Sequence, residues 1–422
     1  MATTLALDEL DFAALIRPGD TVTWGQATAE PTPLTGLLMD QRHRIGPFSV
    51  FVGISHSTTV DPLNADIVRF RGYCGTGENR RLVETGLLDI VPSHYSDMAG
   101  RLPEQIDVLL LQLAEAEDEQ GYSLGLAHEY LVPLIDTARI VVAEVNDQLP
   151  WTMGERVLFE NDIDVLIRTS RPAMEISAPP PGPVELAIAR RVTDLIEDGS
   201  ILQMGLGALP KAVFAQLLNH SDIGIHSGVI GDEVAELVEA GVVTNARKTI
   251  DPGVSVAGLL VGSRRLYDFA HKNRSLAMRS TAYTHCPSIL ERIDRFVAVN
   301  SAIEVDLTGQ VNAEMARGTY VGAVGGAVDF LRGAHRSKGG LPIIALPSKA
   351  GRGERAVSRI VSRLSGPVST TRSDAGIIVT EHGVADLRGR SISQRIQCML
   401  DLADPAFRDT LERDARMNGG LI

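Results

Sequence analysis

The chain has 422 residues, 44% of them hydrophobic, which is enough to bury the cores of two or three domains and excludes a disordered or fibrous protein. Its 40 basic and 53 acidic side chains leave a net charge of −13, which argues against a surface devoted to nucleic-acid or membrane phosphates. The cysteines Cys74, Cys286 and Cys398 lie far apart without a CxxC pair, so we predict neither a disulfide framework nor a metal site.

The N-terminal segment does not resemble a signal peptide. Its apolar stretch carries acidic residues, and it lacks a basic start and a small-residue cleavage site. No apolar run in the sequence reaches the roughly 18 residues that span a bilayer. We therefore expect a cytoplasmic protein whose partners include neither membranes nor nucleic acids.

Short apolar runs alternate with helical patterns along the chain. Continuous apolar strands between helices are typical of parallel sheets buried on both faces, so we predict an α/β fold with two open parallel sheets. The first half contains DTVTW (20–24), FSVFVGI (48–54), DVLLLQL (107–113), RIVVAEV (139–145) and DVLIR (164–168). The second half contains IGIHSG (223–228), FVAVNS (296–301), PIIALP (342–347) and AGIIVT (375–380).

A proline-rich stretch marks the predicted domain boundary. Residues 179–183 hold four prolines in five positions, which continue neither a helix nor an inner strand. We predict an N-terminal α/β domain over 1–177, a linker over 178–183 and a C-terminal α/β domain over 184–422. Because ligands of open sheets bind at the carboxyl ends of strands, we expect the site between the two domains.

Two glycine-rich segments follow predicted strands of the second half. QMGLGALP (203–210) opens a predicted helix, where backbone amides can meet a phosphate, although a plain tight turn explains it equally well. It lacks the third glycine of a dinucleotide fingerprint and the P-loop lysine. GAVGGAVDF (322–330) permits close approach of a ligand, and close packing of a helix on a sheet is the alternative.

Ionisable residues also follow predicted strands. Glu381 and His382 come directly after 375–380, where adjacent ionisable groups can do acid–base work, with capping and an Asp386 to Arg388 pair as the structural alternative. His226 and Ser227 end another run, but the GxSxG elbow is absent, so Ser227 is not a predicted nucleophile.

Taken together, these segments resemble the acetyl-CoA hydrolase/CoA-transferase family, which includes 4-hydroxybutyrate and butyrate:acetate CoA-transferases. The resemblance implies two open α/β domains, a homodimer, acyl-CoA thioesters and a small-molecule acceptor as substrates, and no permanently bound cofactor. The matching segments keep their order over nearly the whole chain: GQATAEP (25–31), IVVAEVN (140–146), GLGALP (205–210), EAGVVTNARK (239–248), GSRRLYDF (262–269), NSAIEVDLTGQ (300–310), GGAVDF (325–330), IIALPS (343–348) and EHGVADLRG (381–389).

The resemblance also implies roles for single residues. Glu381 matches the second active-site glutamate of the family, and Lys349 can neutralise a CoA phosphate as a point charge. The positions matching the CoA-contacting segments are Gly205, Leu206, Gly207, Ala208, Leu209, Ile303, Gly322, Gly326 and Lys349.

Two positions depart from the family pattern. Family members carry a nucleophilic glutamate in a segment of the form HTE followed by an apolar pair and SDG, and that position is Gly228 here. Glycine has no side chain and cannot form the glutamyl-CoA intermediate. The family's glutamine before VDF is Ala327, which removes a polar group from the loop around the thioester.

The leading hypothesis is an acyl-CoA enzyme that uses direct acyl transfer, intermolecular or intramolecular, or hydrolysis, with Glu381, His226 and His382 as catalytic candidates. One alternative is an ordinary acyl-CoA:carboxylate CoA-transferase that uses a displaced carboxylate such as Glu233. Another is an inactive CoA-binding subunit. Acceptor selectivity depends on the N-terminal domain, where Tyr73, His94 and Tyr95 lie in suitable loops but are of types that more often serve packing.

Overall fold

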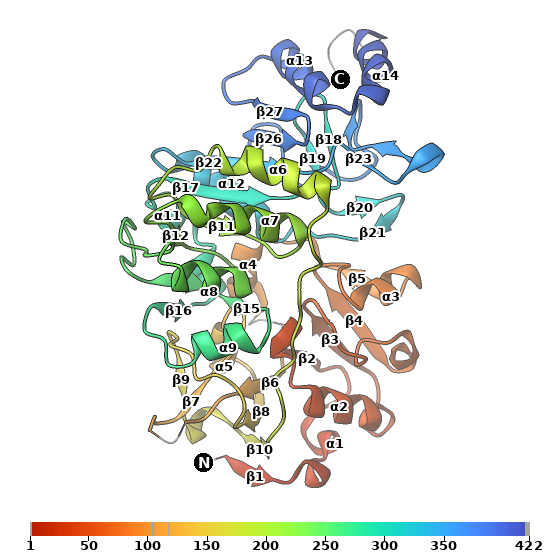
Figure 1. Ribbon diagram of the computed structural model, residues 1–422. Helices are drawn as coiled ribbons and strands as arrows, with labels where there is room; N and C mark the ends of the chain where they lie inside the picture. Colours follow the sequence, from red (N-terminus) through yellow and green to blue (C-terminus); the bar gives the residue numbers. More distant parts are fainter. Residues whose placement is uncertain (1, 103–104, 117, 418–422) are drawn as a thin grey trace. The chain divides into compact units, whose positions relative to one another are not determined.

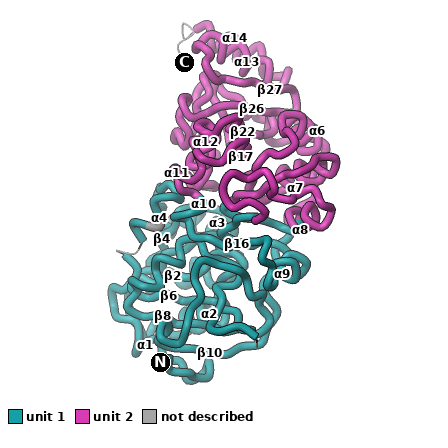
Figure 2. Tube along the Cα trace, turned by 90° about the vertical axis from the view of Figure 1, so that its left-hand side faces the viewer, with its two compact units in different colours: residues 1–177, 228–232, 255–284 teal, residues 178–227, 233–254, 285–422 magenta. Residues whose placement is uncertain are grey.

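The computed structural model describes residues 2–102, 105–116 and 118–417, so the outer limits of the predicted domains, Met1 and Ile422, lie outside it. The chain forms two compact units (Figures 1 and 2). Unit 1 comprises 1–177, 228–232 and 255–284, and unit 2 comprises 178–227, 233–254 and 285–422. The division at Ser177 coincides with the proline-rich stretch, and the two later segments of unit 1 lie in the part of the sequence that we assigned to the C-terminal domain.

Unit 1 is built on an eight-stranded sheet in the order β1-β10-β8-β6-β2-β3-β4-β5, and every neighbouring pair is parallel. Its strands are β1 (Thr3–Leu5), β2 (Thr21–Trp24), β3 (Phe48–Val52), β4 (Val68–Gly72), β5 (Leu88–Ile90), β6 (Val108–Leu113), β8 (Ile140–Asn146) and β10 (Val165–Thr169).

The central strands of this sheet are apolar because helices and loops cover both of their faces. All six residues of β6 are buried, and Val108 and Leu110 join a core cluster to which α2 contributes Leu34 and Leu38. Leu109 and Leu111 alternate with them along the strand, so they face the opposite side of the sheet and are equally buried. This explains why continuous apolar runs predicted these strands.

Apart from the 14-residue helix α2, the remaining elements of unit 1 are short. Its helices are α1 (Phe12–Leu15), α2 (Thr32–Ile45), α3 (Asn79–Glu84), α4 (Tyr95–Arg101), α5 (Val132–Ile135), α9 (Arg264–Ala270) and α10 (Thr281–Thr284). Three two-stranded pairs complete it: β7 (Tyr122–Ser123) with β9 (Val157–Leu158), β13 (Val229–Ile230) with β15 (Leu259–Leu260), and β14 (Ser255–Ala257) with β16 (Leu276–Met278).

Unit 2 is built on a six-stranded sheet in the order β12-β11-β17-β22-β26-β27. All pairs are parallel except the edge pair β26 and β27. Phe296 and Ala298 of β17 pack with Phe330 and Ala334 of α12. The strands are β11 (Ile201–Met204), β12 (Gly224–Ile225), β17 (Phe296–Asn300), β22 (Leu341–Ala345), β26 (Ile377–Thr380) and β27 (Gly383–Asp386).

The helices of unit 2 include α7, the helix that 203–210 was predicted to open. Pro183 is the first residue of α6, where its missing N–H costs no hydrogen bond. The helices are α6 (Pro183–Thr193), α7 (Ala208–Gln216), α8 (Asp232–Glu239), α11 (Pro287–Leu290), α12 (Ala327–Arg336), α13 (Ile392–Leu402) and α14 (Pro405–Met417). Smaller strands are β18 (Glu304–Asp306), β19 (Val311–Asn312), β20 (Met315–Ala316), β21 (Thr319–Tyr320), β23 (Lys349–Ala350), β24 (Val357–Ser358) and β25 (Ile360–Val361).

The structure confirms the predicted α/β class with two open, largely parallel sheets. Each predicted run contains a strand, although 223–228 forms only the two residues of β12. None of the helices in the described ranges combines the length and apolar character that a membrane crossing requires.

Candidate active site

The carboxyl ends of the parallel strands of unit 2 carry most of the predicted site residues. β12, β11, β17, β22 and β26 run in the same direction, so the segments that follow them share one edge of the sheet. His226 follows β12, the 205–209 segment follows β11, and Ile303 follows β17. Ser348 and Lys349 follow β22, and Glu381 and His382 follow β26.

Glu381 is held as a hydrogen-bond acceptor at this edge. Its Oε2 accepts from the Ser348 backbone N–H at 2.8 Å, and its Oε1 accepts from the Ser348 hydroxyl at 2.8 Å. His382 Nε2 lies 3.8 Å from Glu381 Oε1 and has no hydrogen-bond partner within the described residues. The Glu381 side chain is largely buried, so the pair is a fixed carboxylate beside an imidazole.

Lys349 lies next to this pair and is already engaged with an acid. Its Nζ is 2.7 Å from Asp404 Oδ2, and this contact holds the pKa of the Asp404 carboxyl below its ordinary value. The ammonium remains half exposed, so a CoA phosphate can share it. The assignment of Lys349 to CoA binding stays a prediction.

His226 shares the sheet edge with Glu381 but not its immediate surroundings. Three strands lie between β12 and β26, which places about 19 Å between them at the usual spacing of neighbouring strands. The imidazole is fully buried and packs edge-on against Phe296 at 6.3 Å between ring centroids. Of the three catalytic candidates, the structure therefore brings only His382 to Glu381.

The glycines of the predicted CoA segments fall into two groups. A Cβ added to Gly205 or Gly207 would have no atom within 4 Å, so the loop before α7 has room for a ligand. A Cβ on Gly322 would lie 2.0 Å from the Ala313 carbonyl oxygen, and one on Gly326 would lie 2.5 Å from His285 Nε2. Close packing is thus sufficient to require glycine in the second loop.

The other predicted CoA positions lie beside these loops. Leu206 is 42% exposed, and Ala208 and Leu209 begin the first turn of α7. Ile303 precedes β18, and its carbonyl oxygen accepts from Arg359 Nε at 2.8 Å. Ala327, at the position of the family's glutamine, is the first residue of α12.

Gly228 begins the short segment 228–232 of unit 1. Its carbonyl oxygen accepts from the backbone N–H groups of Gly258 at 3.1 Å and Leu259 at 3.0 Å. Glu233, the displaced nucleophile of the alternative reading, is the second residue of α8 and faces Lys211 of α7 at 3.9 Å. Helix α8 thus directs this carboxylate toward a lysine of unit 2.

Unit 1 holds a second carboxylate constellation that sequence reasoning missed. Glu129 is 3% exposed, and both of its oxygens accept from Gln26 Nε2 at 2.8 Å. Oε1 also accepts from the Tyr95 hydroxyl at 2.8 Å, and Tyr73 donates to Gln26 Oε1 at 2.7 Å. Gln26 and Tyr73 follow β2 and β4, so this cluster lies at the carboxyl edge of the eight-stranded sheet.

Burial sets the protonation of Glu129. Loss of hydration raises the pKa of its carboxyl to about 7, and the bonds from Gln26 and Tyr95 oppose that rise. Tyr73 and Tyr95, which the sequence places in loops, have ring centroids 5.4 Å apart. His94 directly precedes α4. No signal in the sequence pointed to Glu129 itself, and GQATAEP, which contains Gln26, served only to support the family resemblance.

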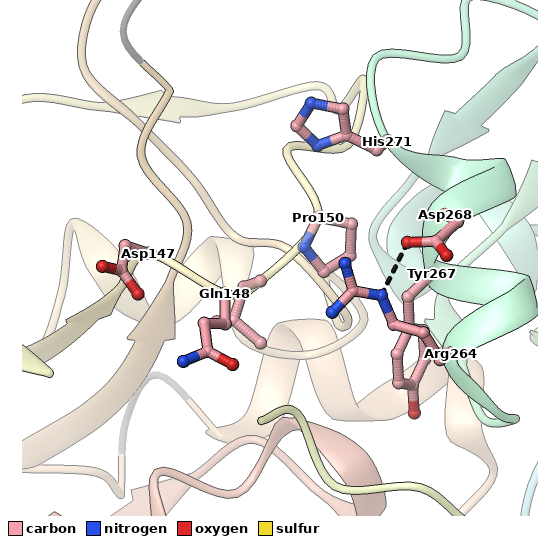
Figure 3. A pocket seen from close by; sticks show the side chains of 8 residues that line it. Asp147, Gln148, Pro150, Arg264, Tyr267, Asp268 and His271 are labelled. Atoms are coloured by element: carbon pink, nitrogen blue, oxygen red, sulfur yellow. Dashed lines mark hydrogen bonds and ion pairs between the residues drawn. The ribbon is translucent and has the colours of Figure 1, made fainter. Parts of the chain in front are cut away.

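A pocket of about 250 Å³ lies elsewhere in unit 1 (Figure 3). The loop after β8 and helix α9 line it, and Arg264 pairs with Asp268 across one of its walls at 2.6 Å. None of the predicted site residues lines this pocket. Within the described ranges, no group of three or more His, Cys, Asp or Glu side chains is placed to hold a metal ion.

Comparison with known proteins identifies close relatives of both halves of the chain. The model of the acetyl-CoA hydrolase/transferase N-terminal domain matches residues 7–172, and that of the C-terminal domain matches residues 262–415. A 4-hydroxybutyrate coenzyme A transferase of Clostridium kluyveri is 40% identical over 341 residues, covering 79% of each chain. A succinyl-CoA:cyclohexane-1-carboxylate CoA transferase of Geobacter metallireducens is 31% identical over 96% of this chain and 94% of its own.

Solved structures agree with these matches. RipA from Yersinia pestis superimposes with a TM-score of 0.92 at 31% identity, covering 99% of this chain and 98% of its own. A 4-hydroxybutyrate CoA-transferase from Porphyromonas gingivalis superimposes with a TM-score of 0.82 at 32% identity, covering 98% and 97%.

Proposed function

Because the chain belongs to the acetyl-CoA hydrolase/transferase family and uses CoA thioesters, we propose that it moves the acyl group directly to an amine, an alcohol or water without a glutamyl-CoA intermediate. The observation that carries this proposal is Gly228, which stands where the family resemblance implies the nucleophilic glutamate. A glycine leaves that position without a carboxylate, so the ordinary covalent step has no nucleophile there.

In the proposed reaction the acceptor attacks the thioester carbonyl carbon. A tetrahedral intermediate forms and its collapse breaks the C–S bond, releasing CoA as a thiolate that takes up a proton. An acceptor group on the acyl chain itself would give a lactam or lactone by the same step. The open space at Gly205 and Gly207 and the half-exposed ammonium of Lys349 support binding of the CoA moiety to unit 2.

We assign Glu381 to the hydrolase or transferase site of unit 2. The two bonds from Ser348 leave its carboxylate fixed and able to accept further donors, and His382 stands beside it. These contacts support a role in binding or orienting the acyl group. We also propose a homodimer, which sedimentation equilibrium tests.

The experiment that tests the proposal combines product analysis with the mass of the enzyme. Purified protein is supplied with short and medium acyl-CoAs and with water, amine, alcohol or carboxylate acceptors, and thiol release is followed. We expect free acid, amide or ester to form while the enzyme mass stays unchanged. CoA appearing on the carboxylate together with a glutamyl-CoA adduct would instead establish an ordinary CoA-transferase.

A variant separates the two chemistries further. Gly228→Glu returns the carboxylate that the family resemblance implies, and we expect it to gain a borohydride-trappable adduct and transfer of CoA to carboxylates. CoA binding without turnover across the whole panel would contradict the proposal and favour an inactive CoA-binding subunit.

A further inference from the structure

We infer that Glu129 is the general base of this enzyme, taking the proton from the acceptor as the acceptor attacks the thioester. The inference rests on the proposed function and assigns the base of that reaction to a residue of unit 1. It assigns chemistry to the carboxyl edge of the eight-stranded sheet, which holds none of the catalytic candidates predicted from the sequence.

The first observation is the position of Glu129 relative to Gly228. Gly258 lies between them: a Cβ built on it would be 3.0 Å from the Gly228 carbonyl oxygen and 3.3 Å from Glu129 Cγ. The Glu129 side chain therefore packs against Gly258, the residue whose backbone N–H donates to the Gly228 carbonyl oxygen. The absence of a side chain on Gly258 permits this approach.

The backbone around Glu129 holds it in this position. The His128 N–H donates to the Gly258 carbonyl at 2.9 Å, and the Thr281 N–H donates to the Glu129 carbonyl at 3.1 Å. Glu129 itself has φ of +29°, outside the regions that a glutamate readily adopts. Conformations of this kind persist only where surrounding contacts enforce them, and they concentrate at functional sites.

The hydrogen bonds of Glu129 leave it able to accept one more donor. An ionised carboxylate offers about four lone-pair sites. Oε1 accepts from Gln26 and Tyr95, whereas Oε2 accepts from Gln26 and from no other donor among the described residues. Tyr73 and the Ile54 N–H both donate to Gln26 Oε1, which fixes the amide with its Nε2 directed at Glu129.

The groups around Glu129 are mainly neutral at pH 7. Burial raises the pKa values of the Tyr73, Tyr95 and Tyr130 phenols well above the ordinary value of a tyrosine, so each phenol stays protonated. Burial lowers the pKa of His128 to about 3, so its imidazole is uncharged. The titratable groups on the segments packed against Glu129 include Glu30, Tyr73, Cys74, Tyr95, His128, Tyr130, Glu155 and Arg279.

The step balances without any further reagent. The acceptor X–H donates to Glu129 Oε2, and its electron pair forms the bond from X to the thioester carbonyl carbon. The C–S bond then breaks, and the CoA thiolate receives the proton held by Glu129. A base whose pKa lies near the working pH suits this task. Its carboxylate is available to take the proton from the acceptor, and its protonated form is acidic enough to give that proton to the CoA thiolate.

The primary test compares Glu129→Gln with the wild type in thiol release from butyryl-CoA, with water and ethanolamine as acceptors. We expect kcat to fall at least 100-fold, the range in which positioned bases act, while the Kd for CoA by calorimetry changes less than 3-fold. The wild-type kcat should rise with pH through about 7, where the Glu129 carboxyl ionises. The variant should not show this rise.

Two further variants separate catalysis from folding. Glu30→Gln also neutralises a buried carboxyl of unit 1, one that accepts from Ser55, Ser57 and Thr35, and should keep the wild-type pH profile. Tyr95→Phe removes a hydrogen-bond donor that lowers the pKa of Glu129. In this variant the rise of kcat with pH should therefore occur at higher pH. This shift tests the inference even if Glu129→Gln does not fold.

The outcomes distinguish this inference from the proposed function. A folded Glu129→Gln enzyme with wild-type kcat and pH profile would overturn the role of Glu129 and leave direct acyl transfer intact. A CoA adduct located on Glu129 would make it a nucleophile and overturn both. Loss of CoA binding in Glu129→Gln would show a structural role and contradict the inference.

Discussion

At the scale of single residues, glycine at 258 determines how far a neighbouring side chain can reach. An added methyl group would contact the Gly228 carbonyl oxygen and Glu129 Cγ more closely than ordinary van der Waals distances allow. Either the glutamate or the turn must move to admit it. The space is therefore already used by Glu129.

Gly258→Ala is expected to lower kcat at least 10-fold while CoA affinity is unchanged, because it displaces Glu129 from the turn at Gly228. The clash should also lower the free energy of unfolding by about 1–3 kcal/mol. Acyl-CoA kinetics and chemical denaturation measure the two effects. Gly36→Ala is the matched control, because a Cβ at this position of α2 would meet no atom within 4 Å. This substitution should raise the free energy of unfolding by up to about 1 kcal/mol. Equal kcat values in both variants would contradict this account.

The raised pKa of Glu129 also has a consequence for stability. The folded protein binds this proton up to about pH 7, whereas the unfolded chain releases it near 4.5. Folding is therefore favoured by this group below pH 4.5, and that contribution is lost as pH rises through 7.

The stability lost is on the order of 3 kcal/mol, taken from the difference between the two pKa values. Glu129→Gln cannot ionise, so its stability relative to the wild type should improve by about this amount between pH 4.5 and pH 8. Urea denaturation at several pH values measures the difference. A constant difference across that range would show that Glu129 has an ordinary pKa.

At the scale of elements, two glycine-rich loops that look alike in sequence behave differently in the fold. The loop between β11 and α7 is open at Gly205, whereas Gly322 is pressed against the backbone of Ala313. Open space leaves the first loop available to a ligand, whereas packing alone is sufficient to explain the second. Sequence could not separate them, because the Ala313 contact depends on the turn between β19 and α12.

The corresponding prediction uses one substitution at each loop. Gly205→Ala should fold with wild-type stability and bind CoA at least 5-fold more weakly, because its methyl group enters the space left for the ligand. Gly322→Ala should unfold at a lower temperature, since the methyl would lie 2.0 Å from a carbonyl oxygen. Thermal denaturation and CoA titration of both variants check this. Unchanged CoA binding in Gly205→Ala would remove that loop from the site.

Strand placement was predictable from the sequence for a physical reason. A strand buried on both faces has few polar positions, so nearly continuous apolar runs such as those of β6 and β17 indicate strands. β4 was missed because charged Arg69 and Arg71 alternate with apolar residues, and it lies one strand from the sheet edge. Glu129 was unpredictable, because its partners are 34 and 103 residues away in the chain.

At the scale of the whole molecule, each unit presents a buried or largely buried carboxylate at the carboxyl edge of a parallel sheet. Glu381 is fixed by Ser348 in unit 2, and Glu129 is fixed by Gln26 and Tyr95 in unit 1. Their surroundings differ: the half-exposed ammonium of Lys349 lies close to Glu381, whereas the phenols of Tyr73, Tyr95 and Tyr130 lie around Glu129. On these separate observations we propose that unit 2 recognises CoA and that unit 1 supplies the base, a division of roles between the two units.

Hydrogen exchange on the full chain tests this division. Free CoA, which lacks the acyl group, should slow exchange in 203–210 and 347–350, because its phosphates meet the loop before α7 and Lys349. Helix α2 in unit 1 should exchange at an unchanged rate and serves as the internal control. Lys349→Ala should weaken CoA binding more at low salt than at high salt, since screening already reduces the attraction that it removes. Protection confined to unit 1 would place the CoA site on the other sheet and contradict the division.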